Sequence, residues 1–212
     1  MTDKLDFKRE YRDLYLPPRR PMLLEVPGMN FLMVDREGAP QGERYQEAVG
    51  LLYAVAFTIK MSRLSGDAPA GYQDFVVPPL EGLWELGPEG FDPAHKGNWK
   101  WTSLLRLPDF VTPEVFAWAK ERAHAKKGDS LDFSRIRFAS FSEGLCVQMM
   151  HIGPYEAETA SLHKMQEFML ENGLADLAPT GRRHHEIYLS DPRRTAPEKL
   201  RTVLRHPVAR AD

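Results

Sequence analysis

The sequence predicts an α+β fold in which two pseudo-symmetric strand-helix-strand-strand halves form one antiparallel sheet, with helices on one side and a central ligand cleft. The order strand, helix, strand, strand occurs twice within the 212 residues. The spacing also repeats, because Glu43 to Tyr72 and Glu156 to His185 span the same number of positions from the start of a helix to the following strand. Two such units can pair edge to edge, which places the helices against one face of the sheet. Ligand sites favour the seam between such halves.

The chain divides into an N-terminal arm and one domain. Residues 1–20 are polar and end in Pro17-Pro18, so we expect an irregular arm that is too short for a helix-turn-helix domain. Residues 21–212 are expected to form a single domain. Its first half covers about 21–110, a connecting helix covers about 112–127, and the second half covers about 136–210.

In the first half, a strand at 22–34 is interrupted by Pro27-Gly28. Residues 43–63 carry apolar side chains at helical spacing. A strand is predicted at 72–77, ended by Pro78-Pro79, with residues 82–84 as an irregular edge. A further strand at 99–107 stops at Pro108.

The connecting helix begins with Thr112 as N-cap and Pro113 in its first turn, and Gly128 ends it. The second half opens with a strand at 145–152, and Gly153-Pro154 turns the chain into a helix at 156–171, with Gly173 as the expected C-cap. Two strands follow, at 184–189 and at 200–208.

The composition indicates a soluble globular protein, with 42% hydrophobic and 27% charged residues. The net charge of −2 gives no extended basic face, so a nucleic-acid partner is not expected. The single cysteine, Cys146, excludes an intrachain disulfide and lies in an apolar run typical of a buried thiol. There is no signal peptide or membrane-spanning run, so we expect a cytoplasmic protein without a membrane partner.

The most informative residue is Glu186. Alternation along residues 184–189 places His184, Glu186 and Tyr188 on one face of a strand. An acid at the centre of such a strand either faces solvent or lies in a cleft that uses its charge. The aromatic Tyr188 on the same face favours the cleft.

Aromatic side chains elsewhere are candidates for the wall of that cleft. Trp99 and Trp101 alternate with polar residues, which indicates either a ligand wall or a pair buried in the core. Trp84 and Phe75 are weaker candidates for the same wall. A negative group among aromatic rings suits a flat molecule that is cationic or electrophilic.

Two further residues are candidates for the pocket. Glu81 is either a second pocket acid or a loop carboxylate in water. Met149 is either part of an adaptable pocket or core filling.

His184 and Glu186 could chelate a metal from one strand face, but helical histidine pairs and paired cysteines are lacking, so we predict no metal site. No P-loop, dinucleotide fingerprint or Gly-x-Ser-x-Gly elbow is present, and we predict no cofactor.

These stretches resemble the GyrI-like small-molecule-binding family, in its subgroup without a DNA-binding domain. The segments Gly153-Pro154-Tyr155 and Glu186-Ile187-Tyr188 are the most specific. The loop at 36–41 departs from the pattern of relatives, which affects the cleft rim and the choice of ligand. The resemblance covers nearly all of residues 20–210, and its matching segments are 72–84, 100–112, 143–148, 151–155, 184–192 and 204–208.

The resemblance implies two halves around a ligand cleft, with Glu186 matching a central glutamate. Some members of the family sense or sequester drugs, and a subgroup similar to this chain hydrolyses cyclopropane-bearing, DNA-alkylating natural products. For such a hydrolase, Trp99 and Trp101 would stack on the substrate and Glu186 would act as general base, while Tyr188 or Tyr155 would donate a hydrogen bond to the carbonyl oxygen.

Two other functions remain open from the sequence. The first is binding of hydrophobic or cationic aromatic drugs without turnover. The second is an interaction module whose cleft takes a peptide or partner protein. The sequence is compatible with a monomer or a homodimer.

Overall fold

The computed structural model describes residues 4–85 and 93–211. Its strands form one antiparallel sheet in the order β1-β6-β9-β8-β3-β4-β2-β5, with β7 paired to β9, which confirms the α+β class. The strands are β1 Met22–Val26, β2 Met29–Glu37, β3 Leu80–Trp84, β4 Lys100–Arg106, β5 Ile136–Phe141, β6 Gly144–Ile152, β7 Leu174–Asp176, β8 His184–Tyr188 and β9 Arg201–Arg210. The helices are α1 Phe7–Glu10, α2 Arg12–Tyr15, α3 Glu43–Ser65, α4 Pro113–Lys127 and α5 Thr159–Glu171.

The strand order is symmetric about the β8–β3 pair at the centre of the sheet. Strand β9 then corresponds to β4, β6 to β2, and β1 to β5. Each half also lends a strand to the other, because β1 pairs with β6 while the following β2 pairs with β4 and β5. The two halves are therefore tied together at the centre and at both edges, and the central β3–β8 pair is the seam.

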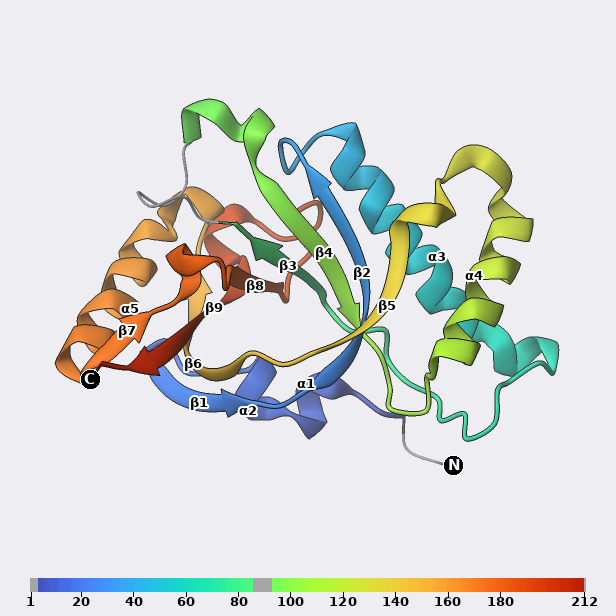
Figure 1. Cartoon of the computed structure of the whole chain (residues 1–212), viewed down its shortest axis with the longest axis horizontal. Coiled ribbons are helices and arrows are strands. Elements are labelled where there is room, and N and C mark those ends of the chain that lie inside the picture. The colour runs from blue at the N-terminus through green and yellow to red at the C-terminus, as the bar shows by residue number, and fades with distance from the viewer. Residues whose placement is uncertain (1–3, 86–92, 212) are drawn as a thin grey trace.

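Helices α3, α4 and α5 cover the same face of the sheet, α5 over the second half and α3 with α4 over the first (Figure 1). By length and composition alone α3 could span a membrane. Its apolar side chains instead pack against the sheet, which is the usual origin of such a helix in a globular core. The fully buried residues of α3 include Leu51, Leu52, Val55 and Ile59.

The opposite face of the sheet is covered by the N-terminal arm. Residues 7–15 form two helical turns, where the sequence predicted an irregular arm. Phe7, Leu14 and Tyr15 enter a core cluster with Cys146 and Ile187. A few large apolar side chains are enough to fold a polar segment onto the sheet, because the burial of each one stabilises the folded state by about 1.5–3 kcal/mol.

One predicted strand was wrong. Residues 72–77 form a single bridge, from Phe75 to Leu5, and the strand that follows α3 is β3 at 80–84. Lys60 of α3 holds this segment by donating to Asp74 and to the Phe75 carbonyl, so the segment packs against the helix instead of joining the sheet. The equal spacing from Glu43 and Glu156 therefore did not identify equivalent strands. Strands β5 and β7 were not predicted.

The helix boundaries follow the capping pattern closely. Thr112 Oγ1 accepts a hydrogen bond from the Val115 amide at 3.3 Å, and Gly128 ends α4 as predicted. The second-half helix begins later than expected, since residues 155–157 form a 3-10 turn before α5. Its C-cap is Asn172, one residue before the predicted Gly173.

Candidate functional site

Glu186 lies at the centre of the sheet on the face that the helices cover. On β8 it is paired with Gly82 of β3 on one side and with Leu204 of β9 on the other. Its exposed fraction is 6%, so this acid is buried instead of facing solvent. A carboxylate in such a place needs polar partners to offset its desolvation.

Aromatic rings from three elements gather beside it. Trp84 of β3 contacts Trp101 of β4 at 6.3 Å between ring centroids and Trp99 at 5.9 Å. Tyr45 of α3 lies 5.0 Å from Trp101 and is stacked on Trp84 at 6.4 Å. Trp84 and Trp101 are buried, and Trp99 is half-buried. The sequence did not indicate Tyr45, because its place in the cluster depends on how α3 lies on the sheet.

Tyr188 joins this cluster to Glu186. The Trp84 indole donates to the Tyr188 hydroxyl at 3.0 Å, and the bond passes directly above Gly82. Burial, followed by the nearby Glu186 charge, raises the pKa of Tyr188 well above its ordinary value. The ring of Tyr155 meets that of Tyr188 edge to face at 6.0 Å. Both predicted tyrosines therefore lie at the seam beside the carboxylate.

A second carboxyl group, Glu158, lies close to Glu186 and was not predicted. It precedes α5, and its exposed fraction is 8%. Within the described part of the chain, Glu158 Oε1 has no hydrogen-bond partner. Burial, followed by the charge of Glu186, raises the pKa of Glu158 to about 10. Glu158 therefore keeps its proton at neutral pH, as expected when two buried carboxyl groups share a site.

Tyr155 belongs to the same electrostatic group. Burial, followed by the charge of Glu186, raises the pKa of its hydroxyl to about 12. Its proton is thus available for a hydrogen bond over the whole physiological range. The resulting arrangement has a carboxylate-bearing strand with neutral acid and phenol donors beside it.

Glu186 also ends a chain of short polar contacts that runs toward the surface. His184 Nε2 lies 3.0 Å from Glu186 Oε1, and His184 Nδ1 lies 2.7 Å from His206 Nε2. His206 Nδ1 lies 2.8 Å from Asp176 Oδ2. Sequence alternation placed His184 beside Glu186, but β9 and β7 supply the other two members.

Glu81 needs a correction. It is neither a loop carboxylate nor part of the Glu186 site, because β3 alternates and directs it to the opposite face of the sheet. There its Oε2 lies 2.9 Å from His185 Nε2, and Tyr15 donates to its other oxygen at 3.2 Å. His185 Nδ1 lies 2.9 Å from Glu143 Oε2.

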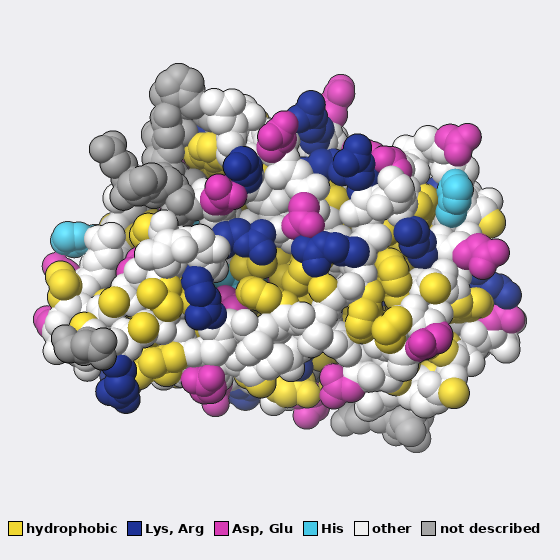
Figure 2. All heavy atoms as spheres, viewed as in Figure 1, with side chains coloured by type: hydrophobic (Ala, Val, Ile, Leu, Met, Phe, Trp, Pro, Cys, Tyr) yellow, Lys and Arg dark blue, Asp and Glu magenta, His cyan; other side chains and the backbone are white. Residues whose placement is uncertain are grey.

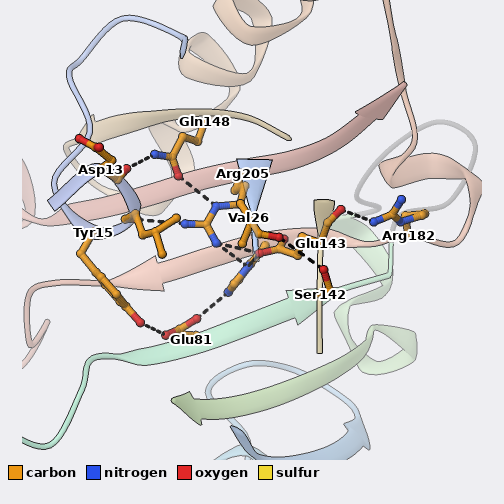
Figure 3. A network of polar contacts seen from close by, with 11 residues as sticks. Asp13, Tyr15, Val26, Glu81, Ser142, Glu143, Gln148, Arg182 and Arg205 are labelled. Carbon is orange, nitrogen blue, oxygen red and sulfur yellow. Dashed lines mark hydrogen bonds and ion pairs between the residues drawn. The ribbon is translucent and has the colours of Figure 1, made fainter. Parts of the chain in front are cut away.

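This second network is closed by Arg205, which donates to Glu143 at 2.7 Å, to Gln148 at 3.0 Å and to the Leu14 carbonyl at 3.0 Å (Figure 3). Burial alone would lower the pKa of His185, but Glu143 and Glu81 raise it to about 9. The cations His185 and Arg205 in turn overcome burial and lower the pKa of Glu143 to about 2. Two buried cations thus balance two buried carboxylates, and the N-terminal arm covers them.

Two other predicted wall residues belong to the core. Phe75 is fully buried, with its ring 6.2 Å from that of Phe110, and it lies among the side chains of the α3 cluster. Met149 packs under α5 in the same cluster as Leu204. Met149 thus fulfils its core-filling alternative, and Phe75 is a core residue as well, since each is enclosed by apolar neighbours.

A surface hollow of about 750 Å³ lies near one end of β4. It includes Trp101 but does not include Glu186. Arg183, which enters it, has a left-handed φ of 63° and donates to Thr102 at 2.5 Å. The hollow therefore does not reach the buried Glu186 carboxyl group. The residues that line the hollow are Asp35, Arg36, Glu37, Arg44, Glu47, Glu85, Lys100, Trp101, Thr102, Asp132, Arg135 and Arg183.

Among residues 4–85 and 93–211, no group of three or more His, Cys, Asp or Glu side chains is arranged to hold a metal ion. On the face shown in Figure 2, basic and acidic side chains are interspersed and neither forms a continuous patch. The side chains at the seam are carboxyl groups, phenols, imidazoles and indoles.

Comparison with known proteins gives a consistent result. The family model of the GyrI-like small molecule binding domain matches residues 116–209. A crystal structure of a hydrolase from Listeria innocua is 51% identical, with a TM-score of 0.89, and the match covers 97% of this chain and 100% of that one. An uncharacterized conserved protein from Listeria innocua is 53% identical, with a TM-score of 0.92 and coverage of 97% and 100%. No curated protein matches. The chain belongs to the GyrI-like small-molecule-binding family.

Proposed function

We propose that this protein is a hydrolase that opens the cyclopropane ring of electrophilic, DNA-alkylating aromatic compounds, and so removes their reactivity. The observation that carries the proposal is the pair of buried carboxyl groups, Glu186 and Glu158, beside a cluster of aromatic rings. Two similar structures from Listeria innocua are named hydrolases, which supports hydrolytic chemistry.

The substrate stacks against Trp101 and Trp99 and excludes bulk water. Glu186 orients one retained water molecule and accepts its proton as the water attacks the strained ring carbon. General base catalysis contributes typically 10²–10⁴-fold, and ring strain lowers the remaining barrier. Tyr188, held by the Trp84 indole, fixes the position of Glu186.

Opening the ring moves an electron pair onto the conjugated carbonyl oxygen of the substrate. Tyr155 and the protonated Glu158 are the donors for that oxygen. Both stay protonated at neutral pH because burial and the Glu186 charge raise their pKa values. A neutral acid held in this way stabilises developing negative charge without adding a cation to the site.

The second candidate is binding of lipophilic cations without turnover. A buried carboxylate among Tyr45, Trp84 and Trp101 favours a flat cation, since both the charge and the ring faces attract it. This function needs no activated water.

The test compares wild type with Glu186→Gln on a cyclopropane-containing alkylator and on a panel of fluorescent lipophilic cations. We expect wild type to convert the alkylator and the variant to lose at least about 10²-fold in rate. Equal rates would remove Glu186 from catalysis. Cation binding by wild type without conversion of the alkylator would favour the second candidate. A wild-type protein that neither converts the alkylator nor binds the cations would point to a protein or peptide partner. Glu167→Gln, a change to an exposed acid of α5, is the matched control.

A further inference from the structure

Glu186 is linked to Asp176 through His184 and His206 by contacts that need one proton more than two neutral imidazoles supply. They join four titratable groups by three short contacts, of 3.0, 2.7 and 2.8 Å. Each contact lies between two atoms that repel one another unless a proton lies between them. Three protons are therefore needed, whereas two neutral imidazoles bring two. One extra proton must be held within the chain of four groups.

That extra proton has four positions that satisfy all three contacts. It lies on the Asp176 carboxyl, it makes His206 an imidazolium beside Asp176, it makes His184 an imidazolium beside Glu186, or it lies on the Glu186 carboxyl. These arrangements differ by proton shifts along hydrogen bonds that already exist, with no movement of heavy atoms. We propose that Asp176, His206 and His184 form a proton relay that exchanges protons between Glu186 and the protein surface.

The path is directional because burial changes along it. The His184 side chain is completely buried and that of Glu186 is 9% exposed, whereas that of Asp176 is 22% exposed. Asp176 is fixed at the outer end by accepting the Ala178 amide at 2.9 Å. Water thus reaches the outer end of the relay, while the reacting end stays under the helices.

The charges around each end agree with this direction. Burial, followed by the His206 charge, lowers the pKa of His184, while Glu186 acts against that change. The His206 hydrogen bond and charge overcome burial and lower the pKa of Asp176. Glu158, Tyr155, Tyr45 and Tyr188 face the inner end and are neutral when protonated. The proton therefore moves outward from Glu186 toward His206, and His185 on the opposite face also repels it from His184.

The relay deepens, and rests on, the proposed hydrolysis. There the O–H bond of water breaks, its proton goes to Glu186, and its oxygen bonds to the ring carbon. The ring C–C bond breaks and its electron pair moves through the conjugated system to the carbonyl oxygen, which becomes a phenolate within the same product. The proton on Glu186 then passes through His184 and His206 to Asp176 and into solvent, where it balances the phenolate charge. The relay thereby restores the Glu186 carboxylate for the next turnover.

Two variants test the relay, each interrupting it without touching substrate. His206→Gln keeps hydrogen-bonding groups but cannot pass a proton from one side to the other. Asp176→Asn keeps an acceptor for the Ala178 amide but presents an amide donor to His206 and cannot hold a relayed proton. We expect kcat to fall about 10²-fold in His206→Gln, at the low end of what positioned proton transfer contributes, with KM little changed. His163→Gln, on the exposed face of α5, should behave as wild type.

If His206 and Asp176 had only a structural role, their variants would not change the solvent isotope effect on kcat. For wild type we expect a solvent isotope effect on kcat with a curved dependence on the deuterium fraction, and a loss of that curvature in both variants. Variants that retain the wild-type kcat and curvature would overturn the relay while leaving the proposed function in place, provided that Glu186→Gln is inactive.

If wild type converts no alkylator, the proposed function fails. A second measurement, which needs no turnover, still tests the relay. Nitrogen-15 shifts of the two rings and carbon-13 shifts of the Glu186 and Asp176 carboxyls count the protons of the relay in the intact protein at neutral pH. Three protons across the four groups, falling to two in Asp176→Asn, would support the relay. Two protons in wild type would overturn it.

Discussion

His185 and Glu186 are neighbours in the sequence, but their side chains enter two separate buried polar networks on opposite faces of the sheet. The Glu186 network lies under the helices and contains groups that can exchange protons. The His185 network lies under the N-terminal arm and contains fixed charges that balance one another. A single strand at the seam therefore supplies both the proposed chemistry and the electrostatic support behind it.

Gly82 lies opposite Glu186 in the β3–β8 pair, and its lack of a side chain is necessary. A Cβ atom there would lie 2.8 Å from Trp84 Nε1 and 2.9 Å from the Tyr188 hydroxyl. We predict that Gly82→Ala breaks the bond between those two side chains and destabilises the protein by about 1–3 kcal/mol.

Urea unfolding measures the stability. The turnover rate of the alkylator shows whether Glu186 is still correctly positioned once the bond between Trp84 and Tyr188 is broken. Gly28→Ala is the matched control, because a Cβ atom there meets its nearest neighbour at 3.9 Å. A Gly82→Ala protein with wild-type stability and rate would contradict the role assigned to this position.

Glu158→Gln separates hydrolysis from simple binding. Glutamine has the shape and the neutral charge of a protonated glutamate, so the fold and the affinity for lipophilic cations should change little. We expect the hydrolysis rate to fall by about 10–10³-fold, because an amide is a weaker donor to a developing oxyanion. Stopped-flow turnover and cation titration on the same preparation give both results. An unchanged rate would exclude Glu158 as a donor.

Much of the fold could be predicted because several elements have local causes. The break at Pro27-Gly28, the Thr112 cap and the alternation at 184–189 each depend on a few adjacent residues. Strand β3 could not be predicted, since Leu80 to Trp84 follows two prolines and contains a glycine and a buried acid. Its pairing with β4 and β8 determines its conformation.

The candidate site was predictable only in part, for a similar reason. Glu186, Tyr188 and the tryptophans could be chosen from alternation and composition. Tyr45 of α3 and Glu158, which directly precedes α5, could not be chosen, because each reaches the seam through the packing of a helix on the sheet. Glu81 was misplaced because its face depends on the register of a strand that had not been predicted.

Arg205 should be essential for stability because it neutralises buried Glu143. We predict that Arg205→Met destabilises the protein by about 3–5 kcal/mol, since Glu143 is left without one of its two cations. Adding Glu143→Gln removes the uncompensated charge and leaves Glu81 paired with His185. The double variant should therefore be more stable than Arg205→Met alone. Chemical denaturation of both proteins checks this, and strictly additive losses would show that the two side chains are not coupled.

The same network predicts how stability depends on pH. His185 has a pKa raised from 6.5 to about 9, so its stabilisation is complete below about pH 6.5 and is lost as the pH rises to about 9. Glu143 has a pKa lowered from 4.5 to about 2, so its stabilisation is complete above about pH 4.5 and is lost as the pH falls toward 2. The combined contribution is greatest between about pH 4.5 and 6.5, with each complete loss on the order of 3 kcal/mol.

Urea unfolding of wild type from pH 3 to 10 measures this dependence, and His185→Gln supplies the comparison. The variant should be less stable than wild type at pH 6 and should lack the decline between pH 6.5 and 9. Because His124 and His163 are exposed, removing either leaves that decline in place. A wild-type stability that stays constant from pH 6.5 to 9 would mean that His185 is neutral in the folded protein. Glu81 and Glu143 would then share a proton instead of balancing a buried imidazolium.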